Sequence, residues 1–358
     1  MLLFLFGLFA IGGTIGSAVR TVVLPRAVPS FISRRVFRTV RVFFNIRVGP
    51  RASYETVDRV LAGYGPASLL ALLLTWLMIL LGAYVAMFWA NGVRPLREAF
   101  STSGSSLLTL GFEHPTDLPN TALAFSEAAL GLFILALLIT YLPSIYGAFS
   151  RREAMVAMLE VRAGAPPSAV EMIERYTRIE FRGGLEELWP RWETWFVELE
   201  ETHTSMPVVG FFRSPQPNQS WVTAAGTVLD AASLVSSTLE GPRQPDAELC
   251  IRAGYIALRR IAGYFRVPYD EDPNPDDPIS IDRHEFDQVC ERLEQAGAQI
   301  KSDRDQAWRD FAGWRVNYDR PLLGLALLVA APVAMWSSDR SPSARSALAL
   351  TRGRRRRA

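Results

Sequence analysis

The chain has 358 residues, of which 49% are hydrophobic and 21% are charged. The formal net charge of +2 gives no information about nucleic-acid binding, because the positive charge is concentrated locally, and we expect no nucleic-acid partner. The two cysteines, Cys250 and Cys290, are too few for a disulfide framework and lack metal-ligand spacing. Many apolar residues beside many charged ones predict a membrane domain and a soluble domain in one chain.

Three stretches without a charged side chain stand out, at residues 1–19, 60–93 and 128–150. A helix needs about 20 apolar residues to cross the hydrocarbon core of a bilayer. Each stretch therefore predicts a transmembrane helix, the first of them over residues 1–20. Interfacial aromatic residues support the spans: these are Trp76, Trp89 and Tyr141.

Two assignments have alternatives. The first stretch resembles a cleavable signal peptide in having the small residues Gly16 and Ala18, but no charge precedes its apolar run, so a retained span is favoured. A fourth apolar run, residues 322–336, is short and contains Pro332, which predicts a buried or interfacial helix rather than a span.

Basic residues between the first and second spans set the predicted orientation. The loop's arginines are Arg20, Arg26, Arg34, Arg35, Arg38, Arg41, Arg47, Arg51 and Arg59. This loop is expected to be cytoplasmic, which puts the N-terminus and residues 91–120 outside and the large C-terminal part inside. The predicted location is the plasma (inner) cell membrane, crossed more than once.

The predicted basic cytoplasmic linker, residues 21–65, contains a stretch that mixes arginines with aromatic residues, at residues 31–48. Such a pattern predicts an amphipathic helix lying on anionic lipid. The alternative is a helix packed on the soluble domain. The arginines expected to meet headgroups are Arg34, Arg35, Arg38 and Arg41.

The segment between the second and third spans, residues 94–119, is not uniformly polar as a simple loop would be. Residues 97–108 predict a helix of about three turns, too short to cross. A glycine-bearing extended segment is expected to follow it. Backbone of this kind is tolerated at membrane depth only where protein or water surrounds it, which predicts a re-entrant loop.

Between the two spans, the short helix is followed by Thr109-Leu110-Gly111-Phe112. This arrangement, over residues 66–150, resembles the two-transmembrane pore module of the potassium-channel superfamily. The resemblance implies that Thr109, Leu110, Gly111, Phe112 and Glu113 form a selectivity filter whose carbonyl oxygens replace the ion's hydration shell. It also implies a homotetramer, because one loop supplies a quarter of such a filter. The expected permeant ion is a monovalent cation, K⁺ first, with no cofactor.

The sequence departs from the family at Glu113, where the family has a second glycine. The outermost filter site is therefore expected to be rearranged, with a ring of Glu113 carboxylates concentrating cations at the outer mouth. A structural carboxylate tied to backbone N–H groups is the alternative for this residue. A non-selective cation pore is the alternative for the channel.

Other residues of the module have predicted supporting roles. Ser105, Ser106 and Glu127 are expected behind the filter, since a carboxylate at the start of a span is costly toward lipid. Pro143 is predicted to interrupt the third span near its cytoplasmic end and, with Gly147, to shape a gate at the inner mouth. An ordinary helix end at Pro143 is the alternative.

Residues 151–358 predict an all-α cytoplasmic domain, because helical patterns alternate with proline and glycine breaks. The third span is expected to continue to Gly164, and Ser168 with Glu171 predicts a capping box. The aromatic cluster Trp189, Trp192, Trp195 and Phe196 is expected in a core or subunit interface.

The apolar segment 220–239 contains Asp230 and is expected to pack in water rather than in lipid. The acidic turn 269–278 lacks the glycine and terminal glutamate of a calcium loop. No nucleotide, metal or nucleophile–base motif is found, so an enzyme is not expected. A membrane-anchored signalling or scaffold protein with a degenerate pore loop stays as an alternative function.

Overall fold

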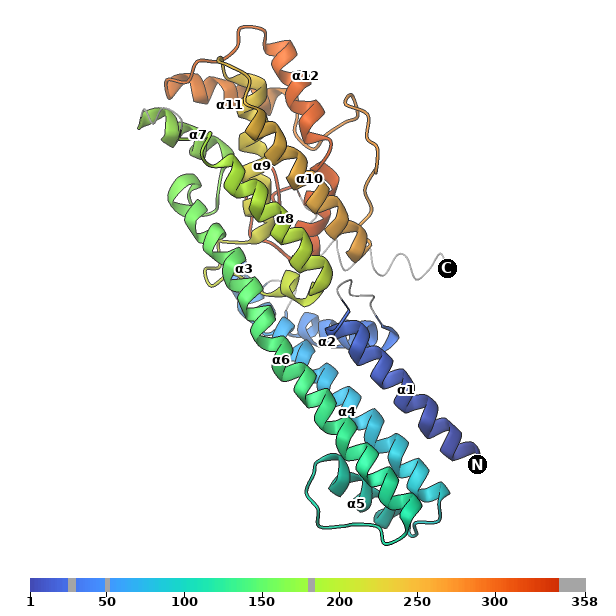
Figure 1. The fold of residues 1–358 in the computed structure, drawn as a ribbon. Coiled ribbons are helices and arrows are strands. Elements are labelled where there is room, and N and C mark those ends of the chain that lie inside the picture. Colours follow the sequence, from blue (N-terminus) through green and yellow to red (C-terminus); the bar gives the residue numbers. More distant parts are fainter. Residues whose placement is uncertain (25–29, 49–51, 180–183, 341–358) are drawn as a thin grey trace. The chain divides into compact units, whose positions relative to one another are not determined.

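The computed structural model describes residues 1–24, 30–48, 52–179 and 184–340 (Figure 1). Over these ranges the regular secondary structure is helical and no strand forms, apart from an isolated bridge between Leu239 and Ile300. The predicted all-α class is confirmed. Arg26, Arg51 and the basic tail 352–358 lie outside the described residues.

The first seven helices include the three predicted spans, the helix of the basic linker and the short helix between the second and third spans. They are α1 (Leu2–Val22), α2 (Phe31–Arg47), α3 (Tyr54–Ala62), α4 (Tyr64–Ala90), α5 (Leu96–Leu107), α6 (Leu118–Ala163) and α7 (Ala169–Arg178).

The remaining helices belong to the later part of the chain. They are α8 (Trp189–Ser205), the 3₁₀ helix η1 (Pro207–Phe211), α9 (Trp221–Thr238), α10 (Pro245–Phe265), α11 (Arg283–Gln295), α12 (Arg304–Arg315) and α13 (Asp319–Val329).

The chain divides into two compact units that interleave in sequence. We call them the membrane unit, residues 1–49, 59–147 and 205–212, and the C-terminal unit, residues 50–58, 148–204 and 213–358. Each unit is described by itself below.

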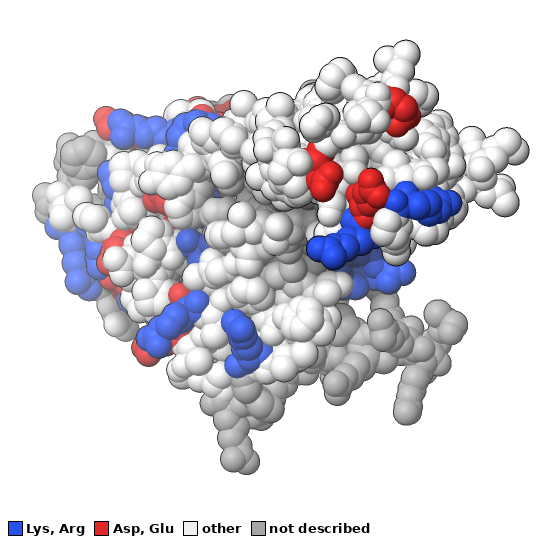
Figure 2. Space-filling model, turned by 90° about the horizontal axis from the view of Figure 1, so that it is seen from below, with Lys and Arg blue, Asp and Glu red and all other residues white. Residues whose placement is uncertain are grey.

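Three helical stretches are long and apolar enough to cross a membrane: Leu2–Val22, Tyr54–Ala90 and Leu118–Ala163. They coincide with the three predicted spans. Broad areas of the surface in Figure 2 carry neither basic nor acidic residues, as expected of a protein with lipid-facing helices.

Within the membrane unit, α1 and α4 pack against each other in opposite directions. Gly7, near the start of α1, faces Ala83 and Met87 of α4, where an added Cβ would lie 2.7 Å from the Ala83 carbonyl oxygen. Near the other end of α1, Trp76 Nε1 donates to Ser17 Oγ at 3.1 Å. The short α5 and the basic α2 also pack on α4, so α4 is the central helix of this unit.

The core of the C-terminal unit is built around α9, which is buried along almost its whole length. Helices α7, α10, α12 and α13 pack against it. The close helix packing expected for residues 220–239 is therefore confirmed. The four aromatic side chains predicted for a core or interface all lie in this core: Trp189, Trp192, Trp195 and Phe196.

A buried ionic network crosses this core. Arg315 pairs with Asp230, and its Nε lies 2.9 Å from Asp319 Oδ1. The Tyr318 hydroxyl donates to Asp230 Oδ1 at 2.9 Å, and Arg315 also donates to the Trp336 carbonyl oxygen at 2.5 Å. The network ties α9, which is otherwise uncharged, to the end of the described chain.

The predicted end of α6 is confirmed, and the alternative of a helix end at Pro143 is wrong. Helix α6 passes through Pro143 and ends at Ala163, before Gly164 with φ +80° as predicted. A single lost hydrogen bond at a proline can be tolerated where flanking turns continue the helix.

The capping box predicted at Ser168 is only half present. Ser168 Oγ accepts from the Glu171 backbone N–H, but the Glu171 carboxylate pairs with Arg175 instead of reaching back. The predicted buried helix within residues 322–336 is confirmed, since Leu322 and Leu325 of α13 are fully buried.

Candidate functional site

The short helix α5 is the central element of the candidate site. It spans 12 residues, Leu96–Leu107, against the predicted 97–108. At about 1.5 Å per residue it is on the order of 18 Å long, well short of a bilayer core of about 30 Å. It nevertheless packs on α4 and contributes Ala99 and Leu107 to the apolar core of the membrane unit.

A buried hydrogen bond joins α5 to α6. Ser103 Oγ donates to Glu127 Oε1 at 2.5 Å, and Ser103 also contacts the Leu81 carbonyl oxygen of α4 at 3.2 Å. Glu127 is fully buried, and its Oε2 has no hydrogen-bond partner in the described part of the chain. The contact predicted between Glu127 and the short helix is therefore present.

Close packing of α5 on α6 requires a glycine. A Cβ at Gly131 would lie 2.6 Å from the carbonyl oxygen of Leu107, the last residue of α5. Real Cβ atoms do not approach backbone oxygen this closely, so the absence of a side chain at Gly131 permits the end of α5 to lie against α6.

Ser105 anchors the loop that follows α5. Its carbonyl oxygen accepts from the Leu110 backbone N–H at 2.8 Å. Its hydroxyl accepts from the Glu113 N–H at 3.0 Å and lies 3.0 Å from the Glu113 carbonyl oxygen. Ser106, predicted beside it, instead bonds the Thr102 carbonyl oxygen within α5.

The loop backbone differs from the predicted extended segment. Thr109 and Gly111 adopt left-handed conformations with φ of 55° and 72°, which return the chain toward Ser105 instead of extending it. Glycine takes this conformation freely, whereas threonine there is strained by about 1 kcal/mol or more. No positive φ occurs at Glu113.

The loop side chains point to the surface of the single chain. Leu110 and Phe112 are 59% and 63% exposed, and Glu113 is exposed as well. Large apolar side chains exposed on a loop are costly in water.

Both ends of the segment are fixed by polar contacts. Asn91 at the end of α4 donates to Asn120 Oδ1 at 3.1 Å, and Asn120 donates to Asp117 from both its backbone and its side chain. Tyr84 and Ser126 hydroxyls lie 2.8 Å apart. The end of α4 and the start of α6, which flank the segment, are thus joined by side-chain hydrogen bonds.

Sequence reasoning missed Ser103 and the Asn91–Asn120 pair. Ser103 lies four residues after the buried Ala99, on the helix face that meets α6, and this spacing was the available signal. For Asn91 and Asn120, the available sequence signal was their position near the end of α4 and the start of α6. Pro143 and Gly147 both lie inside α6, and their role as a gate stays a prediction.

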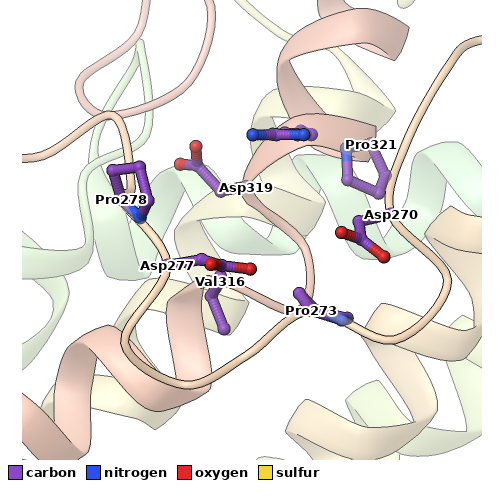
Figure 3. A pocket seen from close by; sticks show the side chains of 8 residues that line it. Asp270, Pro273, Asp277, Pro278, Val316, Asp319 and Pro321 are labelled. Atoms are coloured by element: carbon purple, nitrogen blue, oxygen red, sulfur yellow. The ribbon is translucent and has the colours of Figure 1, made fainter.

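A small pocket lies in the C-terminal unit, beside the acidic turn. Figure 3 shows the carboxylates of Asp270, Asp277 and Asp319 around it. Asp319 is already engaged by Ser280 and Arg315. Within the described ranges no group of three or more His, Cys, Asp or Glu side chains is arranged to hold a metal ion.

Comparison with known proteins gives no relative: no protein family, curated protein or solved structure matches the chain.

Proposed function

We propose that the protein is one subunit of a homotetrameric cation channel, with K⁺ as the first expected ion and residues 109–113 as its selectivity filter. Conduction is passive, and the C-terminal unit lies in the cytoplasm, where it influences opening.

One observation carries this proposal: a helix too short to cross is packed among the spans and ends in an exposed, polar-anchored loop. Ser103–Glu127 and Gly131–Leu107 hold α5 in this position. A simple extramembrane loop would need neither a buried carboxylate nor a glycine to admit a helix end. Burying Glu127 among spans is costly, and such residues in membrane proteins commonly serve function.

The charge distribution supports a cation as the permeant species. The C-terminal end of a helix carries a partial negative charge, and α5 ends directly at the loop. Glu98 lies in the first turn of α5, where its carboxylate stabilises the partial positive charge of the helix N-terminus. Glu113 adds an exposed carboxylate beyond the loop, which attracts cations.

The exposed surface of the membrane unit supports assembly. The buried positions of α6 include Glu127, Gly131 and Ile134, so one face packs inside the chain. Its other face exposes apolar side chains: Leu132, Leu135, Ile139, Leu142 and Tyr146. Lipid or further copies must cover this face, and a ring of four copies gives each loop a place around one axis.

The test is ion flux through the purified full chain in liposomes, under K⁺ and then Na⁺ gradients. The decisive variant is Gly111→Asp, with Gly92→Asp as its matched control. Both glycines have positive φ and open space around the Cβ position, so backbone strain is similar, but Gly92 lies in the turn before α5. We expect Gly111→Asp to abolish flux and Gly92→Asp to retain it.

Selectivity separates the two channel hypotheses. A K⁺ flux far above the Na⁺ flux supports a potassium channel, and similar fluxes support a non-selective cation pore. Absence of flux under every gradient, voltage and pH would contradict the proposal and favour a membrane-anchored signalling or scaffold protein.

A further inference from the structure

The basic helix α2 lies where the spans end. Its N-cap Ser30 contacts Ser17 of α1 at 2.6 Å between hydroxyl oxygens, and the Tyr64 hydroxyl donates to the Phe37 carbonyl oxygen at 3.2 Å. Tyr64 is the first residue of α4. Helix α2 is therefore attached at the last turns of α1 and the first turn of α4, which is the level of a membrane interface.

Of the five arginines of α2, Arg47 lies in the last turn and the other four fall into two groups. Arg41 is held by the chain, with its guanidinium over the Tyr64 ring at 5.1 Å. Arg34, Arg35 and Arg38 are exposed, and none of them forms an ion pair with a carboxylate in the described part of the chain. No acidic residue occupies the first turn of α2, so the positive charge of these three side chains is uncompensated.

The same exposed side of α2 carries large apolar residues. Phe31, Phe43 and Ile46 are 68%, 64% and 72% exposed. The Arg35 guanidinium lies over the Phe31 ring at 5.1 Å. Arginines alternating with exposed aromatic and branched side chains suit a bilayer interface, where apolar parts enter the acyl boundary and guanidinium groups reach the headgroups.

We propose that α2 is a binding surface for anionic lipid headgroups. Arg34, Arg35 and Arg38 bind the headgroups, Phe43 and Ile46 insert beneath them, and Arg41 has a structural role on Tyr64. This surface also links lipid to the spans, because Tyr64 joins α2 to the start of α4 and its ring meets that of Phe211 edge-on at 5.3 Å. The inference does not depend on ion conduction.

The test measures the depth of a spin label on the full chain in nanodiscs. Ile46→Cys provides the labelling position, since the native Cys250 and Cys290 are buried. Depth is read from the relative accessibility of the label to oxygen and to a water-soluble nickel complex, in zwitterionic phosphatidylcholine and in mixtures with phosphatidylglycerol. We expect the label to lie deeper when phosphatidylglycerol is present.

The charge dependence is tested with Arg34→Gln, Arg35→Gln and Arg38→Gln together. The matched control replaces three exposed arginines of the C-terminal unit: Arg178→Gln, Arg191→Gln and Arg252→Gln. Each interfacial arginine contributes about fivefold to binding, so the first triple variant should weaken the lipid-dependent insertion on the order of a hundredfold. Salt at about 1 M should weaken it as well, because screening shortens to about 3 Å.

The control triple variant should keep the lipid response. A label at equal depth in both lipids, or an equal loss in the two triple variants, would overturn the proposal. Because the measurement needs no flux, its failure is distinct from failure of the channel proposal.

Discussion

At the scale of single residues, two hypotheses for Glu113 are an electrostatic role at the outer mouth and a structural role in the loop. Only its backbone is tied to Ser105, while the side chain is exposed. A ring of free carboxylates concentrates cations at low ionic strength, where the screening length is about 30 Å, and does little at 1 M salt, where it is about 3 Å.

We therefore expect Glu113→Gln to lower cation flux several-fold at about 10 mM salt and to leave it unchanged at about 1 M. Glu98→Gln, an exposed carboxylate at the other end of α5, is the control and should change flux little. An equal loss at both salt concentrations would contradict the electrostatic role and favour a structural one.

Asp230 gives a pH-dependent prediction for the C-terminal unit. Burial raises its pKa to about 6, although Arg315 and the Tyr318 hydroxyl act in the opposite direction and Asp319 adds to the rise. Between about pH 4 and 6 the unfolded chain ionises this carboxyl and the folded chain keeps it protonated. The stabilisation from Asp230 is thus present at low pH and lost as the pH rises through 6.

We expect the stability of the native chain relative to Asp230→Asn to fall by on the order of 2 kcal/mol between pH 4 and 6.5. Unfolding in detergent, followed by tryptophan fluorescence, measures it. Asp305→Asn is the control of opposite sign, because Arg283 lowers the pKa of the exposed Asp305. If the stability of the native chain relative to Asp230→Asn stayed constant or rose with pH, a raised pKa of Asp230 would be contradicted.

At the scale of elements, the position of α5 depends on a close approach to α6. Gly131→Ala places a Cβ 2.6 Å from the Leu107 carbonyl oxygen. Because this oxygen belongs to the backbone, the clash is relieved only if the end of α5 moves. We expect a loss of stability on the order of 1 to 3 kcal/mol and loss of flux, measured by thermal unfolding in detergent and liposome assay.

Gly82→Ala on α4 is the matched control, since its Cβ position has open space. Alanine there should be neutral or stabilise by up to about 1 kcal/mol through helix propensity. Equal behaviour of the two variants would show that α5 does not need the contact with α6.

Much of the element scale follows from sequence. The lengths of the stretches without charged residues predict α1, α4 and α6, because crossing a bilayer requires about 20 apolar residues in a helix. Glycine and proline predict the end of α6 at Gly164. The loop after α5 was predicted, but its left-handed conformation at Thr109 and Gly111 was not. This conformation accompanies hydrogen bonds that Ser105 makes across a turn, which no local pattern reports.

At the scale of the whole molecule, the proposed assembly has a defined mass. Light scattering of the detergent-solubilised protein, corrected for detergent, should give four copies of the 39.8 kDa chain. The physical reason is the exposed apolar side of α6 and of the loop. A stable monomer or dimer that still conducts would contradict a fourfold filter.

The predicted orientation is tested with single cysteines in intact cells. The native thiols should stay silent, because both are buried and burial raises the pKa of Cys290 to about 11. We expect Thr116→Cys, in the exposed loop before α6, to react with a membrane-impermeant maleimide. Arg252→Cys should react only after permeabilisation, and the reverse pattern would contradict the topology.

The sequence by itself determined the class of this protein: helical, with three apolar helices long enough to span a bilayer and a helical C-terminal part. These features depend on composition over whole segments, which hydrophobic length and local helix signals report directly.

Only the tertiary structure decided which polar groups meet. Glu127 bonds Ser103 rather than Ser105 or Ser106, Arg41 lies on Tyr64 while its neighbours on α2 stay exposed, and Asp230 lies buried against Arg315. Such contacts join residues distant in sequence, and their geometry is fixed by helix packing, which no local pattern encodes.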